Sequence, residues 1–211
     1  MSVLQRLASF QNKRDNVPNQ ELAIDLVKKN DREGIREIAE NLNNPDKKIQ
    51  SDCIKVLYET GYIKPELISD YADVFIGLLK SINNRLVWGG MIALSTVASI
   101  KPKTVFNNLD EIMDAIEKGS AITRDSGIKA LALAASSDES GHSKIFPLLM
   151  NHLLTCRPKE IPMHAEYIMP AVKKNNRSEF VDILRARIKL LKPSQFKRIK
   201  KILNSFSPVT A

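Results

Sequence analysis

Apolar residues recur along the chain in short stretches with helical spacing, and the stretches themselves repeat. Within each stretch, apolar side chains lie three or four positions apart, as on one face of an α-helix. A shift of 37 residues aligns three stretches, residues 49–57, 86–94 and 123–131. The matching columns are Cys53, Gly90 and Gly127; Ile54, Met91 and Ile128; Val56, Ala93 and Ala130; and Leu57, Leu94 and Leu131. A fixed period of this length predicts stacked helical repeats.

The segments before these stretches follow the same period. Their apolar columns are Ile38, Phe75, Ile112 and Leu149, then Leu42, Leu79, Ile116 and Leu153. Residues 43–46, 82–84 and 118–120 separate the first helix of a pair from the second, because Asn, Asp, Gly and Pro end helices and form turns. Residues 64–65 and 101–102, both Lys-Pro, separate one pair from the next. The predicted unit is helix A, short turn, helix B, linker.

The small residue in each helix B predicts close packing. Glycine costs about 1 kcal/mol relative to alanine inside a helix. Gly90 and Gly127 at equivalent positions therefore indicate that helix B approaches its neighbour closely. A chance occurrence, or a kink in the helix, is the simpler alternative.

The repeat length, the Asn-Pro-Asp turn and the strings Ile-Lys-Val-Leu (54–57), Met-Ile-Ala-Leu (91–94) and Ile-Lys-Ala-Leu (128–131) resemble HEAT repeats over about residues 31–174. The expected fold is all-α, a right-handed α-α superhelix of about five to six antiparallel helix pairs. The fourth unit departs from the pattern, since Pro158 and Pro162 flank its second helix and His164 replaces the small residue. We expect that repeat to be bent or capped differently.

The predicted organisation is one solenoid domain over residues 1–211. Its parts are an N-terminal capping pair in residues 1–30 (helices at about 2–12 and 19–29), HEAT-like repeats in 31–174, and a basic C-terminal capping pair in 175–211 (helices at about 178–192 and 194–206). Capping pairs are expected because the end repeats of a solenoid need a polar outer face.

Composition agrees with a folded helical protein. Hydrophobic residues make up 43% and charged residues 27% of the chain, and only 6% are aromatic, which suits stacked helices better than a sandwich or barrel. Two cysteines are too few for a disulfide framework, and no stretch approaches the roughly 20 apolar residues of a membrane span. We expect a cytoplasmic protein, or one in another reducing compartment, with Cys53 as a buried thiol rather than a reactive one.

Candidate chemistry is sparse. The three histidines share no metal-ligand spacing in the sequence. We expect His142 in a polar loop, His152 beside the core column of a helix A, and His164 packed in a helix B. The sequence has no Gly-rich phosphate loop and no nucleophile elbow. The sequence therefore predicts a non-enzymatic protein without cofactor or metal.

The resemblance implies a binding surface, because HEAT-like solenoids usually present their B helices on the concave side. The candidate groove residues are Lys48, Lys55, Arg85, Trp88, Ile92, Asp125 and Lys129. A tryptophan beside an arginine and an isoleucine has the composition of an interface hot spot. Packing of Trp88 under a neighbouring turn is an equally open alternative. We expect a macromolecular partner, in the first place a protein.

One enzymatic alternative comes from the same resemblance. Some HEAT-like proteins are alkylpurine DNA glycosylases, which line a concave cleft with aromatics, an acid and arginines. Trp88 and Asp125 lie 37 residues apart, so they occupy equivalent positions on adjacent B helices, and Arg85 lies one turn before Trp88. The single tryptophan of the chain weighs against this activity.

Charge is uneven along the chain. Between Lys173 and Lys201 there are eleven basic and two acidic residues, which account for the whole excess behind the net charge of +8. The candidate basic patch is Lys173, Lys174, Arg177, Arg185, Arg187, Lys189, Lys197, Arg198, Lys200 and Lys201. The final helix, with Ser194 as its expected N-cap, has three interpretations: a cap on the last repeat, a patch for nucleic acid or an acidic protein, and a membrane-surface or calmodulin-target helix. Nucleic-acid binding through this end is the alternative function, whereas a membrane role is the least favoured.

Overall fold

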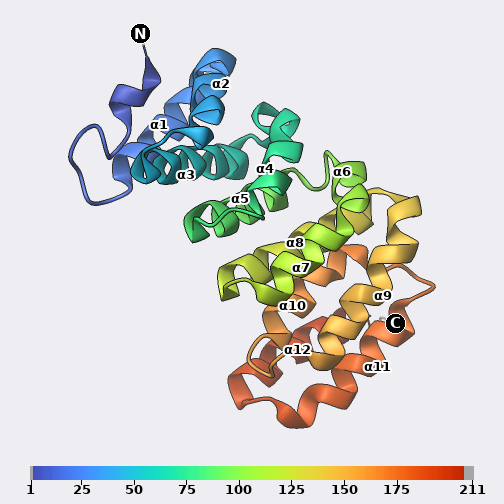
Figure 1. The fold of residues 1–211 in the computed structure, drawn as a ribbon. Coiled ribbons are helices and arrows are strands. Elements are labelled where there is room, and N and C mark those ends of the chain that lie inside the picture. Colours follow the sequence, from blue (N-terminus) through green and yellow to red (C-terminus); the bar gives the residue numbers. More distant parts are fainter. Residues whose placement is uncertain (1, 207–211) are drawn as a thin grey trace.

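The fold is a curved stack of helices that follows chain order from one end of the molecule to the other (Figure 1). The computed structural model describes residues 2–206, and all regular secondary structure within that range is helical. None of the described helices is long and apolar enough to cross a membrane. The predicted all-α solenoid is confirmed.

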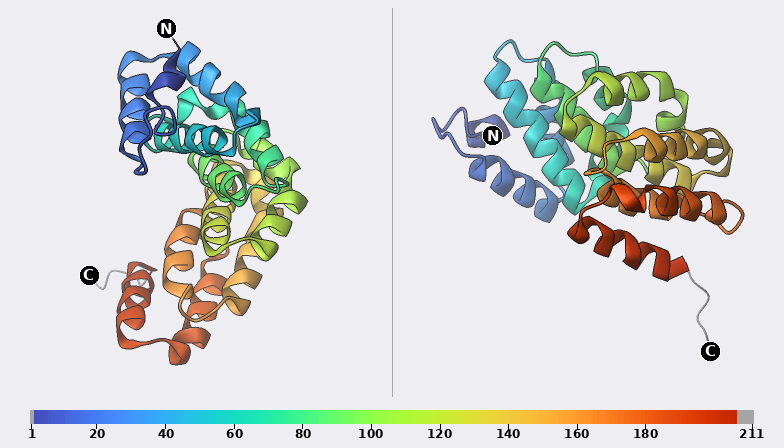
Figure 2. Two further views of the ribbon diagram at one scale, coloured as in Figure 1. Left: turned by 60° about the vertical axis from the view of Figure 1, so that its left-hand side comes forward. Right: turned by 90° about the horizontal axis from the view of Figure 1, so that it is seen from below.

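The B helices form the inner layer of the curve (Figure 2). They are α1 (Val17–Lys29), α3 (Lys47–Ile63), α5 (Asn84–Val97), α8 (Ala121–Ser137), α10 (Ile161–Ile168) and α12 (Pro193–Phe206). Each packs against the next in this order. The stack buries a continuous apolar face that no single helix pair could bury by itself.

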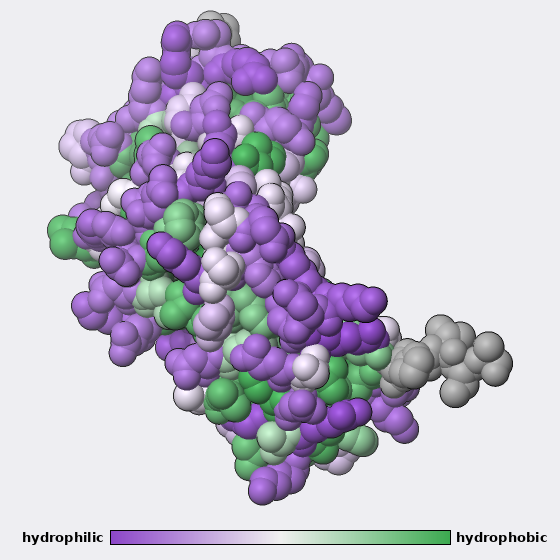
Figure 3. Space-filling model, turned by 90° about the vertical axis from the view of Figure 1, so that its right-hand side faces the viewer, coloured by the Kyte–Doolittle hydropathy of each residue, from purple (hydrophilic) through white to green (hydrophobic). Residues whose placement is uncertain are grey.

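The outer layer contains the A helices, α2 (Arg32–Glu40), α4 (Ala72–Leu78), α7 (Leu109–Lys118), α9 (Glu139–Thr155) and α11 (Arg177–Arg187). Their apolar column is in the core, since Ile38, Phe75, Ile112 and Leu149 are fully buried. The opposite side of these helices faces water. Hydrophilic side chains cover most of the face drawn in Figure 3, interrupted by small apolar patches.

The linkers between repeats contain helix, which the sequence interpretation missed. Pro65 begins the 3-10 helix η3 (Pro65–Leu67), followed by η4 (Ser69–Tyr71), and Pro102 begins α6 (Pro102–Asn107). Proline suits the first helical turn because its φ is already fixed there and no N–H is needed. The second and third repeats therefore have three helical segments. In the fourth, the corresponding segment is continuous with helix A, because α9 runs through Pro147.

The N-terminal pair is also different from the prediction. Its first member is only the short η1 (Val3–Arg6), and the chain then runs without α-helix to α1. Asn12 adopts a left-handed φ of 54°, which interrupts a right-handed helix. The segment is held by side chains instead: Asp52 accepts the Ser9 N–H and the Asn19 amide, and Asn19 accepts the Ala8 N–H.

The C-terminal helices α11 and α12 match their expected positions. Two short 3-10 helices extend helices of the outer layer: η2 (Asn41–Asn43) follows α2, and η6 (Ile188–Leu190) follows α11. Ile199 and Ile202 of α12 are buried, and α12 packs on α10 and α11. The helix begins at Pro193, so Ser194 lies inside it and is not its N-cap. Residues 207–211 of the predicted C-terminal segment lie outside the described residues.

The small column brings helix B close to helix A of the same repeat. A Cβ atom on Gly90 would lie 3.0 Å from Leu78 Cβ and 3.1 Å from the Phe75 carbonyl oxygen. On Gly127 it would lie 2.4 Å from Ile116 Cγ1. The contacts at Gly127 are too short for a Cβ unless Ile116 shifts, and those at Gly90 are tight, so the close approach predicted from the small column is present at both glycines.

Candidate binding groove

An aromatic cluster of Tyr58 and Tyr62 from α3 and Trp88 from α5 lies in the layer of B helices. The ring centroids of Tyr58 and Tyr62 lie 6.0 Å apart in an edge-on arrangement, and those of Tyr58 and Trp88 lie 6.1 Å apart. Tyr58 is 6% exposed and Tyr62 is 54% exposed, whereas Trp88 is half-buried against the core. Trp88 therefore lies between the two predicted environments, an exposed hot-spot residue and a packed one: its ring packs against Tyr58 and remains partly accessible to solvent.

Two lysines flank this cluster. Lys55 Nζ lies 4.8 Å from the centroid of the Tyr58 ring and 2.5 Å from Glu59 Oε1, while Lys129 Nζ lies 5.9 Å from the centroid of the Tyr62 ring. Tyr62 belongs to α3 and Lys129 to α8, so their contact passes over α5. A cation near the negative face of an aromatic ring is attracted to it, which holds these four side chains together.

Ile92 does not contribute an exposed contact. It is a predicted groove residue, but only 8% of its surface is accessible. Its position on α5, between α3 and α8, places it in the packed layer beneath the concave surface. A helix flanked on both sides buries a wider part of its circumference than the one-sided pattern in the sequence indicates.

Lys48 and Arg85 line a basic pocket of about 720 Å³ where the N-terminal ends of α1, α3 and α5 meet. The other basic residues of this pocket are Lys13, Arg14 and Lys47, and the acidic ones are Asp15 and Asp52. Asp15 accepts the Val17 N–H, and Asp52 is occupied by Ser9 and Asn19. None of the five basic residues forms an ion pair with another residue in the range 2–206. The pocket therefore has an excess of free positive charge.

Asp125 is positioned by a buried histidine. Its Oδ1 accepts a hydrogen bond of 2.8 Å from His164 Nε2, and its side chain is 28% exposed. Trp88 and Asp125 lie on adjacent helices as predicted. Arg85, however, lines the basic pocket, and neither Trp88 nor Asp125 does. The structure does not bring the three residues of the glycosylase alternative to one pocket.

His142 was expected in a loop, and this prediction is wrong. Its ring is 5.2 Å from that of Phe146 in a stacked arrangement, and its Nε2 lies 2.9 Å from the Ala171 carbonyl oxygen. The segment is helical because Asp138 caps α9, accepting hydrogen bonds from the Gly141 N–H and the Ser140 hydroxyl. These hydrogen bonds also hold the pKa of Asp138 below its ordinary value. His152 and His164 are on helices A and B, as expected.

Half of the candidate basic patch is occupied within the fold. Lys173 pairs with Glu139, Arg185 with Asp182 and Arg198 with Glu166, while Arg177 donates to the Phe206 carbonyl and Arg187 to three carbonyls at the end of α9. Lys174, Lys189, Lys197, Lys200 and Lys201 are exposed, and no ion pair involves them among the residues that the structure describes.

Several groove residues were not identified from the sequence. Tyr58 and Tyr62 lie one helical turn apart, three and seven positions after Lys55, and this spacing could have placed them beside it. Lys13 and Arg14 lie between the two helices that were expected at about 2–12 and 19–29. Their contribution to the pocket depends on the loop between η1 and α1, and the sequence pattern has no signal for its path.

No protein-family model matches this sequence, and a comparison with curated proteins finds no match. Solved structures do share the fold. An engineered protein superposes with a TM-score of 0.67 at 18% identity, over 97% of this chain and 96% of its own. A designed armadillo repeat protein in complex with the peptide (KR)4 gives 0.64 at 12% identity, over 98% and 100%. Karyopherin Kap121p bound to Pho4p gives 0.62 at 15% identity, over 93% of this chain and 22% of the karyopherin.

These likenesses define the class of the fold. The chain is a helical-repeat solenoid of the HEAT and armadillo type, as its sequence resemblance implied. Two of these three structures contain a bound peptide or protein. At such low identity, the likeness extends to the fold alone.

Proposed function

We propose that this protein is a non-enzymatic scaffold whose concave face binds an extended, acidic segment of a partner protein. The observation that carries the proposal is the continuity between the aromatic cluster and the basic pocket along α3 and α5. Arg85 lies one helical turn from Trp88, and Lys48 lies two turns before Lys55. Aromatic and arginine side chains at the centre of a surface are typical of binding hot spots.

The charges of the groove favour an acidic segment. Its carboxylates are occupied: Glu59 pairs with Lys55, and Asp125 with His164. Lys48 and Arg85, in contrast, have no ion-pair partner in residues 2–206. An incoming carboxylate would gain a charge-assisted hydrogen bond there without displacing an existing one. A basic peptide would meet the same surface with like charges, which is unfavourable.

The fluorescence of Trp88 tests this proposal, because it is the only tryptophan of the chain. A short peptide of alternating glutamate and leucine is titrated against the protein, with the matching lysine–leucine peptide as its charge-reversed control. We expect the glutamate peptide alone to change the emission, with an affinity that falls as salt screens the exposed charges. Lys48→Glu and Arg85→Glu should weaken the binding, whereas Lys174→Glu, far along the chain, should not. Tighter binding of the lysine peptide would contradict the proposal.

A second candidate is nucleic-acid binding through the C-terminal end. The five exposed lysines of the basic patch that have no ion pair in the described range support it. A gel-shift titration at two salt concentrations tests it, because binding to phosphates weakens steeply with salt. The joint variant of Lys197→Glu, Lys200→Glu and Lys201→Glu should abolish the shift. Base release from alkylated DNA, lost in Trp88→Ala or Asp125→Asn, would identify the glycosylase form of this alternative.

A further inference from the structure

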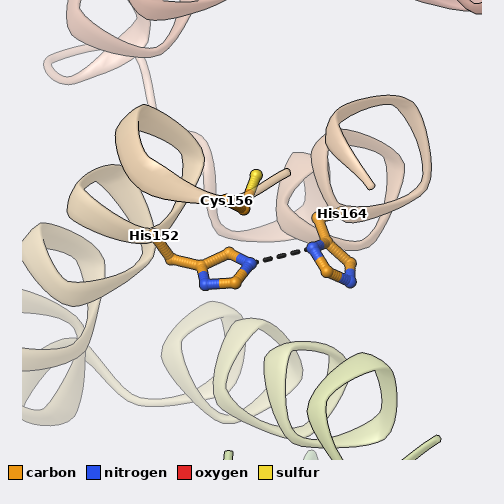
Figure 4. Close-up of side chains that lie close together, drawn as sticks. All are labelled: His152, Cys156 and His164. Carbon is orange, nitrogen blue, oxygen red and sulfur yellow. Dashed lines mark hydrogen bonds between the residues drawn. The ribbon is translucent and has the colours of Figure 1, made fainter. Parts of the chain in front are cut away.

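Three side chains lie close together around the turn between α9 and α10: the rings of His152 and His164 point toward each other, and Cys156 lies beside them (Figure 4). His152 Nε2 lies 2.8 Å from His164 Nδ1, and these two atoms and Cys156 Sγ all lie within 4.8 Å of one another. His152 lies in the last turn of α9, Cys156 is the residue directly after this helix, and His164 reaches back from α10. Three of the five histidine and cysteine residues of the chain are thus gathered in one place.

We propose that His152, Cys156 and His164 form a zinc-binding site. Imidazole nitrogen and thiolate sulfur are the ligands that Zn²⁺ prefers in proteins. Zn–N bonds of about 2.0–2.1 Å and a Zn–S bond of about 2.3 Å in tetrahedral geometry place the two nitrogens about 3.3 Å apart and each nitrogen about 3.6 Å from the sulfur. The nitrogens would separate by about 0.5 Å relative to their present distance, and rotation of the side chains would bring the sulfur closer.

Asp125 supplies the support that a metal-bound histidine needs. Its carboxylate accepts a hydrogen bond from His164 Nε2 at 2.8 Å, which leaves the Nδ1 lone pair directed at the cluster. Metal-binding histidines almost always donate their other N–H to a carboxylate or carbonyl group, which fixes the tautomer and the ring orientation. His164 is itself fully buried, so the imidazole has little freedom to turn away.

The site is accessible from solvent. A cleft of about 550 Å³ has His152 and Cys156 in its wall, together with Arg124, Arg157 and Glu160. Glu160 pairs with both arginines and offsets one of their two positive charges. Zinc binding would convert the Cys156 thiol to a thiolate and release one proton. Water from the cleft would fill the fourth position, which no described side chain occupies.

Such a site would join the two helices of the irregular fourth repeat. Its helix α10 has 8 residues, against 17 in α3 and α8, and it follows a turn that contains Pro158. The ligands come from both sides of this turn, and Asp125 connects them to α8 of the preceding repeat. Zinc would therefore stabilise the folded chain, because a preformed site does not exist in the unfolded one.

The test uses the untagged full-length chain and zinc itself. We expect one zinc per chain after equilibrium dialysis, a melting temperature that rises with added zinc, and a thiolate-to-metal charge-transfer band when Co²⁺ replaces Zn²⁺. Cys156→Ser and His164→Asn should abolish all three, and the matched controls Cys53→Ala and His142→Asn should not. Asp125→Asn keeps all three ligands and should weaken zinc binding about 10–100-fold.

Two results would overturn the proposal. One is the absence of both bound zinc and the cobalt charge-transfer band in the wild-type chain, which would make the cluster a hydrogen-bonded packing contact. The other is zinc binding that persists in both ligand variants, which would place the metal elsewhere. Where a ligand variant does not fold, the cobalt spectrum of the wild-type chain still shows whether a thiolate binds the metal.

Discussion

His164 and Asp125 are 39 residues apart in the chain and 2.8 Å apart in the fold. The buried imidazole of the fourth repeat holds a carboxylate on α8 of the third. In the proposed groove, one acidic side chain is thereby occupied, and the interior of the irregular repeat is connected to the proposed binding surface. Substitution of His164 should accordingly affect both the interior of the irregular repeat and the proposed binding surface.

The glycine column gives a prediction about stability. Gly127→Ala should lower the free energy of unfolding by about 1–3 kcal/mol, the usual cost of overpacking. The new Cβ would lie 2.4 Å from Cγ1 of the buried Ile116, so this side chain would have to shift. Gly77→Ala is the matched control, because nothing lies within 4 Å of its Cβ position, and it should stabilise the chain by up to about 1 kcal/mol. Urea unfolding measures both, and equal effects would contradict the close approach.

Arg187 is expected to act on stability rather than on binding. Its guanidinium donates to the carbonyls of Leu153, Leu154 and Cys156 at the end of α9. Arg187→Ala should lower the free energy of unfolding by about 1.5–3 kcal/mol, the range for hydrogen bonds to a charged group. Arg185→Ala, on the same helix with only an exposed ion pair, should change it by less than about 1 kcal/mol. In a gel-shift assay, the folded Arg187→Ala variant should bind nucleic acid as the wild-type chain does.

Tyr62 is expected to matter for binding and little for folding. Its side chain is 54% exposed and contacts Tyr58 and Lys129. Tyr62→Ala should weaken a groove ligand by about 1–2 kcal/mol or more, the range of a hot-spot residue. Ile63→Ala is the matched control, since Ile63 is the next residue and is 51% exposed, but lies outside the aromatic cluster. Calorimetric titration with the peptide that shifts Trp88 fluorescence compares the two, and equal losses would remove Tyr62 from the site.

Cys53 should be unreactive in the folded chain. Burial, with the nearby Asp52 carboxylate as the next cause, raises the pKa of this thiol to about 12. The thiolate is the nucleophile, and a pKa this far above the ordinary value leaves very little of Cys53 ionised at pH 8. Reaction with iodoacetamide at that pH should be far slower in the native chain than in urea, and its rate should still rise with pH above 9. Rapid labelling of native Cys53, located by mass spectrometry, would contradict the buried environment.

The sequence determined the repeat and its core. Columns such as Ile38, Phe75, Ile112 and Leu149 could be read directly, because a stacked helix buries one face and the same position is apolar in every unit. The close packing at Gly90 and Gly127 could also be predicted from the sequence, because glycine destabilises a helix interior and its recurrence there indicates a steric need. Even the irregularity of the fourth repeat was visible, as proline and histidine stand where small or helix-forming residues stand elsewhere.

Tertiary structure decided which side chains meet across repeats. The path of residues 7–16, which brings Lys13 and Arg14 to the basic pocket, is fixed by hydrogen bonds to Asn19 and Asp52 that no local pattern encodes. The convergence of His152, Cys156 and His164 depends on the angle between α9 and α10, which a turn of a few residues sets. The hydrophobic periodicity of the sequence shows which face of a helix is buried, because burial of a face depends on many neighbouring residues together and on no single contact. A site depends on a few individual distances, and those exist only once the helices are packed.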